Sequence, residues 1–106
     1  MNLSEFSEVN RARCRAWMGE RDTLHHHLIG LMGEFGELCN AIKKADRVGK
    51  PGDTPVDPIA VADEIADVFI YLDLVAMHMN VDLETSIIAK FNATSKKYGF
   101  PHRVRA

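Results

Sequence analysis

Two short stretches, Gly33-Glu34-Phe35-Gly36-Glu37 and Asp63-Glu64-Ile65-Ala66-Asp67, decide how this chain of 106 residues is expected to fold. Each stretch places two carboxylates three residues apart within a helical pattern, and such a pair lies on one face of a helix. Two helices that face each other with these pairs gather four acids, which is unfavourable unless a cation lies among them. The stretches therefore predict two packed helices with a site for a hard divalent cation between them.

The spacing of apolar residues predicts four helices, at about residues 3–19, 23–45, 57–79 and 83–98. In the second helix the apolar residues recur every three or four positions: Leu24, Leu28, Leu31, Phe35, Leu38 and Ile42. Three glycines in this helix should each cost about 1 kcal/mol relative to alanine, so we expect close approach of another helix or a ligand, or ordinary packing. No strand pattern appears, and the links are short. We therefore predict an all-α protomer that resembles a four-helix antiparallel bundle.

Residues typical of helix ends support these boundaries. Ser4 is a candidate N-cap for the first helix, and Gly19 is a plausible stop. Asp57 followed by Pro58 is typical of a helix start, and Asp82 is a candidate N-cap for the last helix. Residues 46–56, which contain two glycines and two prolines, are predicted to form a loop that reaches over a site between the acidic helices. The basic tail, residues 102–106, is expected to be mobile.

The third helix is apolar almost all round, which indicates burial on most sides. A monomer of 106 residues has little core in which to bury a whole helix. We therefore predict a single domain, residues 1–106, that assembles as a homo-oligomer, either a dimer or a tetramer, with the third helix near the interface.

Composition excludes several partners. The formal net charge is −2, so no global basic field attracts nucleic acid. Cys14 and Cys39 have no CxxC spacing, which is typical of reduced thiols in a cytosolic protein. There is no apolar signal segment at the N-terminus and no run of 18 apolar residues. We expect a cytoplasmic protein without a membrane or nucleic-acid partner.

The four acids differ from ordinary surface charges. None of the positions three or four residues from Glu34, Glu37, Glu64 or Asp67 holds Lys or Arg, although surface acids on helices usually have such partners. A di-iron bundle would need Glu-x-x-His on two of its helices, whereas an all-carboxylate set selects hard cations. We therefore interpret these four residues as metal ligands and catalytic residues for Mg²⁺, with Mn²⁺ as a possible substitute.

Other polar side chains point to the substrate class. Tyr71 follows Asp67 by one helical turn, and Lys90 and Lys97 share one face of the last helix. A divalent metal, two lysines and a tyrosine together favour a phosphate chain. The chain has no P-loop and no GxGxxG, so a phosphate site here must rest on metal and side chains.

The histidine run at 25–27 is not a chelating tract. Consecutive helical residues point about 100° apart, so three in a row cannot bind one ion together. They are interpreted as ordinary histidines at a helix start, or, for His27, which points nearest the acids, as a candidate substrate contact.

The sequence resembles the MazG-like nucleotide pyrophosphohydrolases, which belong to the all-α NTP pyrophosphatases. The resemblance covers about residues 24–101 and rests on three stretches: GEFGELCNAIKK, ADEIADVFIYLDLVA and KFNATSKKYGFP. One departure concerns Gly33, which stands where the fuller signature often has Glu, and this leaves the number of metal ions open.

The resemblance implies hydrolysis of a nucleoside triphosphate to the monophosphate and pyrophosphate. Water activated by metal would attack the α-phosphorus while the acids hold Mg²⁺. By analogy Tyr71, Lys90 and Lys97 would contact phosphates or sugar. Asn92 matches a recurring family position, although the helical wheel turns it away from the acids. Trp17 and Phe35 are candidates either for stacking on a base or for the core.

Two alternatives stay open. One is a nucleotide-binding or regulatory helical module without catalysis. The other is a structural bundle whose acids are solvated. Nucleotide turnover separates the enzyme from the first alternative, and stabilisation by Mg²⁺ separates it from the second.

Overall fold

The computed structural model describes residues 1–45 and 57–105, and the predicted loop over residues 46–56 lies outside them. The described elements are α1 (Leu3–Met18), a 3₁₀ turn η1 (Gly19–Arg21), α2 (Leu24–Ala45), α3 (Pro58–His78) and α4 (Leu83–Lys97). Neither described part contains a strand. The all-α prediction is therefore confirmed.

The first helix begins at Leu3 as predicted, but its N-cap lies two residues before the predicted one. Asn2, and not Ser4, is the N-cap, because its side-chain oxygen accepts a hydrogen bond from the backbone N–H of Glu5 at 2.9 Å. Gly19 ends the helix as predicted, with a φ of 53° that a side chain would strain.

The starts of α3 and α4 follow the sequence signals closely. Asp57 caps α3 by accepting from the N–H of Ile59, and Pro58 is the first helical residue. Asp82 caps α4 in the same way. Between these helices Asn80 adopts a φ of 55°, a left-handed conformation that asparagine tolerates better than most residues.

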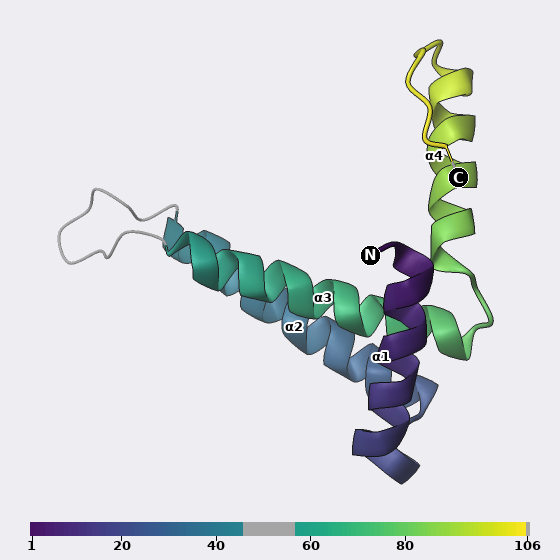
Figure 1. Ribbon diagram of the computed structural model, residues 1–106. Helices are drawn as coiled ribbons and strands as arrows, with labels where there is room; N and C mark the ends of the chain where they lie inside the picture. Colours follow the sequence, from purple (N-terminus) through teal and green to yellow (C-terminus); the bar gives the residue numbers. More distant parts are fainter. Residues whose placement is uncertain (46–56, 106) are drawn as a thin grey trace, which may run out of the picture.

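The helices do not form a four-helix antiparallel bundle within one protomer. α2 and α3 lie side by side and antiparallel, and α1 crosses α3 near its His78 end (Figure 1). α4 contacts α1 at its first turn and then projects away from the α2–α3 pair (Figure 1). The turn around Asn80 directs α4 outward, so the predicted bundle is corrected to a helical hairpin with α1 across it and α4 as an arm.

A buried polar joint fixes α1 against α3. Asp73 of α3 is only 3% exposed, and its carboxylate accepts hydrogen bonds from Ser7 and from Asn10 Nδ2 of α1. The rings of Phe6 and Phe69 pack beside this joint at 5.6 Å between centroids. A buried carboxylate needs such partners because its desolvation would otherwise be costly.

The arm and the tail are held by separate contacts. The Ser4 hydroxyl donates to Glu84 Oε2 at 2.7 Å and connects α1 to the start of α4. In the tail, Val104 donates to and accepts from the Asn92 side chain, at 2.8 Å in both bonds. The tail, which was expected to be mobile, is thus bonded to α4.

The described chain leaves much apolar surface exposed. Its fully buried apolar residues are Cys14, Leu74 and Ala76. By contrast, Met32 is 67% exposed and Ile59 is 71% exposed. The radius of gyration is 17.2 Å, whereas a compact domain of this length has about 13 Å. A single protomer does not bury α3 on most sides, and its burial in a homo-oligomer stays a prediction.

No described helix is both long and apolar enough to cross a membrane.

Candidate metal centre

Three carboxylates meet between α2 and α3. Glu34 and Glu37 stand one turn apart on α2, and Glu64 faces them from α3. One oxygen of each residue lies within 4.8 Å of the oxygens of the other two. The packing of the helical hairpin therefore brings together three of the four predicted ligands.

The electrostatics of this cluster call for positive charge. Burial, together with the neighbouring Glu37, raises the pKa of Glu34 to about 6. The pKa of Glu64 is also raised, by burial and then by Glu37. Over residues 1–45 and 57–105 none of these carboxylates forms an ion pair. Neutralisation comes from a proton or from a cation.

Two unpartnered oxygens indicate which of these fits better. Glu34 Oε2 and Glu64 Oε2 are both buried, and neither has a hydrogen-bond partner in the described chain. Carboxylate oxygens are the ligands that hard divalent cations prefer. The cluster therefore fits a metal ion.

Asp67 lies at the edge of the cluster. It is not among the three residues whose oxygens approach within 4.8 Å. Its charge nevertheless contributes to the raised pKa of Glu34, and both side chains line one cavity. Asp67 thus faces the same space from one turn further along α3.

This cavity has a volume of about 170 Å³ and lies between α1, α2 and α3. Its walls combine the two acids with large apolar or aromatic side chains, and its lining is Arg13, Cys14, Trp17, Met18, Glu34, Asp67, Ile70, Tyr71 and Leu74. Trp17, which is 69% exposed, is thus not a core residue in one protomer. An aromatic wall beside a cluster of acids suits a flat ring attached to a charged chain.

Tyr71 reaches this cavity because α2 carries a glycine opposite it. A Cβ added to Gly30 would lie 2.3 Å from Tyr71 Cε1. The expected close approach is therefore found at Gly30. At Gly33 and Gly36 nothing lies within 4 Å of an added Cβ, so their face of α2 is open in one protomer.

Most of the chain matches one known protein family. The family model described as "MazG nucleotide pyrophosphohydrolase domain" matches residues 22–104. This chain belongs to the MazG family.

Curated relatives of the MazG chain share about a third of its residues. It is 34% identical to dCTP pyrophosphatase 1 of Homo sapiens over 88 residues, which cover 74% of this chain and 51% of the human protein. Its identity to dCTP pyrophosphatase 1 of Mus musculus is 34% over 86 residues, and to that of Bos taurus 30% over 86 residues, with the same coverage. The MazG chain spans about half the length of the curated relatives that it matches.

Three predicted substrate residues lie away from the acids within one MazG protomer. Lys90, Asn92 and Lys97 belong to α4, the arm that leaves the α2–α3 pair (Figure 1). Asn92 is bonded to the tail, and Lys97 Nζ lies 5.3 Å from the centroid of the Tyr98 ring. Their contact with a substrate stays a prediction.

His27 occupies a different environment from the predicted one. Its side chain is fully buried, and its Nε2 lies 2.8 Å from Asp22 Oδ1 and 3.6 Å from Cys14 Sγ. It therefore has no exposed surface to offer a substrate. Neither this cluster nor the buried Asp73 was predicted, because a lone polar residue in a helix gives no periodic signal of its partner.

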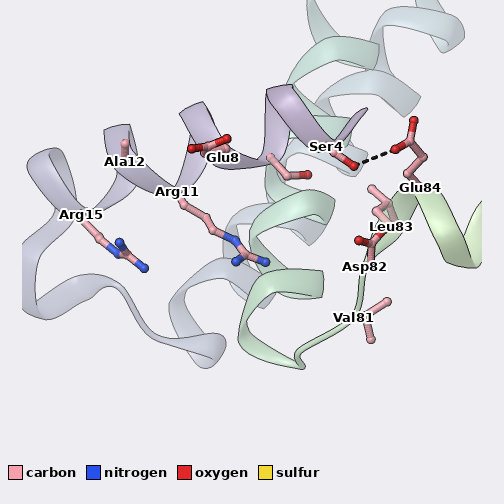
Figure 2. Close-up of a pocket in the computed structure, with 10 residues that line it drawn as sticks. Ser4, Glu8, Arg11, Ala12, Arg15, Val81, Asp82, Leu83 and Glu84 are labelled. Atoms are coloured by element: carbon pink, nitrogen blue, oxygen red, sulfur yellow. Dashed lines mark hydrogen bonds between the residues drawn. The ribbon is translucent and has the colours of Figure 1, made fainter. Parts of the chain in front are cut away.

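A second, larger cavity of about 460 Å³ lies between α1 and the α3–α4 turn. Arg11 and Arg15 extend from α1 along this cavity, opposite the segment from Val81 to Glu84 (Figure 2). None of the four predicted metal ligands lines it, so it is separate from the acid cluster.

Proposed function

We propose that this chain is a Mg²⁺-dependent hydrolase that converts a nucleoside triphosphate to the monophosphate and pyrophosphate. The observation that carries the proposal is the meeting of Glu34, Glu37 and Glu64, with two buried unpartnered oxygens, next to a cavity with an aromatic wall. Family membership supports the reaction class.

Each residue of the site has its own role in this proposal. Glu34, Glu37 and Glu64 hold the metal, and Asp67 completes the set from its edge. Bound there, Mg²⁺ supplies an activated water and neutralises charge at the α-phosphorus. In the hydrolysis a water oxygen would bond to the α-phosphorus and lose its proton to solvent, and the bond from the α-phosphorus to the bridging oxygen would break, so that pyrophosphate leaves.

The cavity binds the nucleoside part. Trp17 provides a face on which a base stacks, and the Tyr71 hydroxyl contacts a phosphate or the sugar. The relatives are named for dCTP, which makes dCTP the first nucleotide to assay.

The functional unit is a homo-oligomer. Support comes from the exposed apolar residues of α2 and α3 and from the extended shape. In such an assembly α4 of one protomer brings Lys90 and Lys97 to the phosphates held by another, which matches the need for positive charge at a triphosphate. Whether the assembly is a dimer or a tetramer follows from its mass in solution.

The direct test is pyrophosphate release from a panel of dNTPs and NTPs with Mg²⁺ or Mn²⁺. Loss of supporting partners around a metal typically costs 10- to 100-fold, so removal of a ligand in Glu64→Gln or Asp67→Asn should lower turnover by at least about 100-fold. Glu20→Gln, an exposed change outside the site, is the control, and circular dichroism verifies the helical fold.

A panel without any turnover would overturn the enzymatic proposal. Calorimetric binding of a nucleotide without product would then favour the regulatory module instead.

A further inference from the structure

A second group of potential ligands lies where α1, α2 and α3 meet. It contains Cys14 of α1, Asp22 in the link after η1, His27 of α2 and His78 at the end of α3. Asp22 Oδ1 lies 2.8 Å from His27 Nε2 and 2.7 Å from His78 Nε2. Cys14 Sγ lies 3.6 Å from His27 Nε2. Four separate segments thus direct polar atoms to one point.

This cluster is buried to a degree that is unusual for its chemistry. His27 is fully buried and Cys14 is 3% exposed, while the side chains of Asp22 and His78 are 17% and 24% exposed. Polar groups are placed in such an interior only when their partners are well arranged. In the described chain His27 Nδ1 is buried without a partner, whereas Nε2 is the ring atom that faces Asp22 and Cys14.

The spacing of three donor atoms brings them within reach of one ion, but Asp22 Oδ1 and His27 Nε2, now 2.8 Å apart in a hydrogen bond, must separate to about 3.3 Å around tetrahedral Zn²⁺. One donor atom from each of Cys14, Asp22 and His27 lies within 4.8 Å of the other two. The separation of 3.6 Å between Sγ and Nε2 is close to the edge of about 3.5 Å expected between sulfur and nitrogen ligands around tetrahedral Zn²⁺. Thiolate and imidazole ligands favour Zn²⁺-class ions over Mg²⁺, so this cluster differs in kind from the carboxylates of the α2–α3 pair.

We propose that Cys14, Asp22 and His27 bind a transition-metal ion of the Zn²⁺ class, and that His78 holds the Asp22 carboxylate in place by its hydrogen bond. Binding displaces the thiol proton of Cys14 to solvent. His27 would coordinate through its Nε2 lone pair as the tautomer that carries its proton on Nδ1, and coordination would replace the hydrogen bond between Nε2 and Asp22 Oδ1. His78 acts as an outer partner of a ligating carboxylate, as is usual in metal sites.

The site would connect the position of α1 to the nucleotide cavity. Cys14 lines that cavity, and Trp17 follows it by one helical turn. The His27 ring also lies 6.3 Å from the Tyr71 ring, between centroids. An ion at this point would therefore hold α1 against α2 and α3, beside the part of the cavity that Trp17 lines.

The test uses the whole chain, freed of metal with a chelator and titrated with Co²⁺. We expect saturable binding of one ion with a thiolate-to-metal charge-transfer band in the near ultraviolet. Cys14→Ser should abolish this band. Cys39→Ser is the matched control, because Cys39 is the exposed thiol of α2, and it should leave the band unchanged.

Absence of the band from the unmodified chain, or its persistence in Cys14→Ser, would overturn the proposal. Glu64→Gln separates this site from the acid cluster, since the band should survive that change. The result is therefore independent of whether any nucleotide is hydrolysed.

A second measurement keeps the test valid if Cys14→Ser does not fold. Competition between the protein and a chromophoric chelator for Zn²⁺ gives its Kd. Asp22→Asn and His78→Gln should each weaken this Kd by about 10-fold or more, while His25→Gln, on an exposed histidine, should not change it. Equal affinity in all of these proteins would reject the site.

Discussion

At the scale of single residues, Glu34 carries the main electrostatic cost of the site. Its folded-state pKa of about 6 lies above the ordinary value of 4.5 because burial and Glu37 disfavour its charged form. The cost is offset only when a proton or a cation occupies the cluster. The acid cluster is therefore also a point at which the stability of the fold depends on pH.

The sign of this dependence follows from the two pKa values of Glu34. Between pH 4.5 and about 6 the folded carboxyl retains a proton that the unfolded one has released, so stability falls as pH rises through this interval and stays lower above it. Without divalent metal, the free energy of unfolding of Glu34→Gln minus that of the unmodified protein should increase as pH rises through this interval. Urea unfolding at several pH values in a chelating buffer measures the difference.

Glu20→Gln serves as the control for this comparison, because Glu20 is exposed. Parallel stability profiles for Glu34→Gln and the unmodified protein would contradict the prediction.

The acid pairs could be predicted from their spacing and their neighbours in the sequence. Contacts between isolated polar residues could not. The absence of Lys and Arg beside Glu34, Glu37 and Glu64 identified the acids before any geometry was known. Asp22 and His78 are 56 positions apart, and their pairing depends on how α3 packs against the link after α1. Their contact is a tertiary effect without a local signal.

At the scale of elements, the approach of α3 to α2 depends on a single missing side chain. Gly30→Ala would place a Cβ against the Tyr71 ring, and such overpacking typically costs about 1–3 kcal/mol. In the single chain Gly36→Ala meets open space and should gain up to about 1 kcal/mol from helix propensity, so both variants are compared in the Ile29→Glu/Met32→Glu background. Thermal unfolding of the two variants should therefore show shifts of opposite sign.

Equal stabilisation of both variants would indicate that the Tyr71 ring moves aside without cost. In that case Gly30 would not be required for the packing of α2 on α3.

Helix ends were predictable because capping is local, whereas helix directions were not. Asp57 and Asp82 cap the helices assigned to them. The outward course of α4 depends on the backbone at Asn80 and on the contact between Ser4 and Glu84. The short link between α3 and α4 therefore does not make these two helices an antiparallel pair.

At the scale of the whole molecule, one protomer leaves an apolar face of α2 exposed to solvent. Ile29 is 60% exposed and Met32 is 67% exposed. In solution we expect a mass that is a multiple of 11.9 kDa. The double variant Ile29→Glu/Met32→Glu should reduce the mass to that of one chain, because it places charge where apolar contact is needed.

Light scattering coupled to gel filtration measures these masses. Arg21→Glu, a charge change at an exposed position of η1 outside α2, is the control and should keep the assembled mass. A single-chain mass for the unmodified protein at micromolar concentration would refute the oligomer.

The division of the acid cluster between two helices has a kinetic consequence. Glu34 and Glu37 precede the segment 46–56, and Glu64 follows it, so the proposed ligand set exists only after the hairpin has closed. An ion that binds this set stabilises the native state more than a transition state in which the hairpin is still open. Mg²⁺ should then lower the unfolding rate many-fold while the refolding rate changes little.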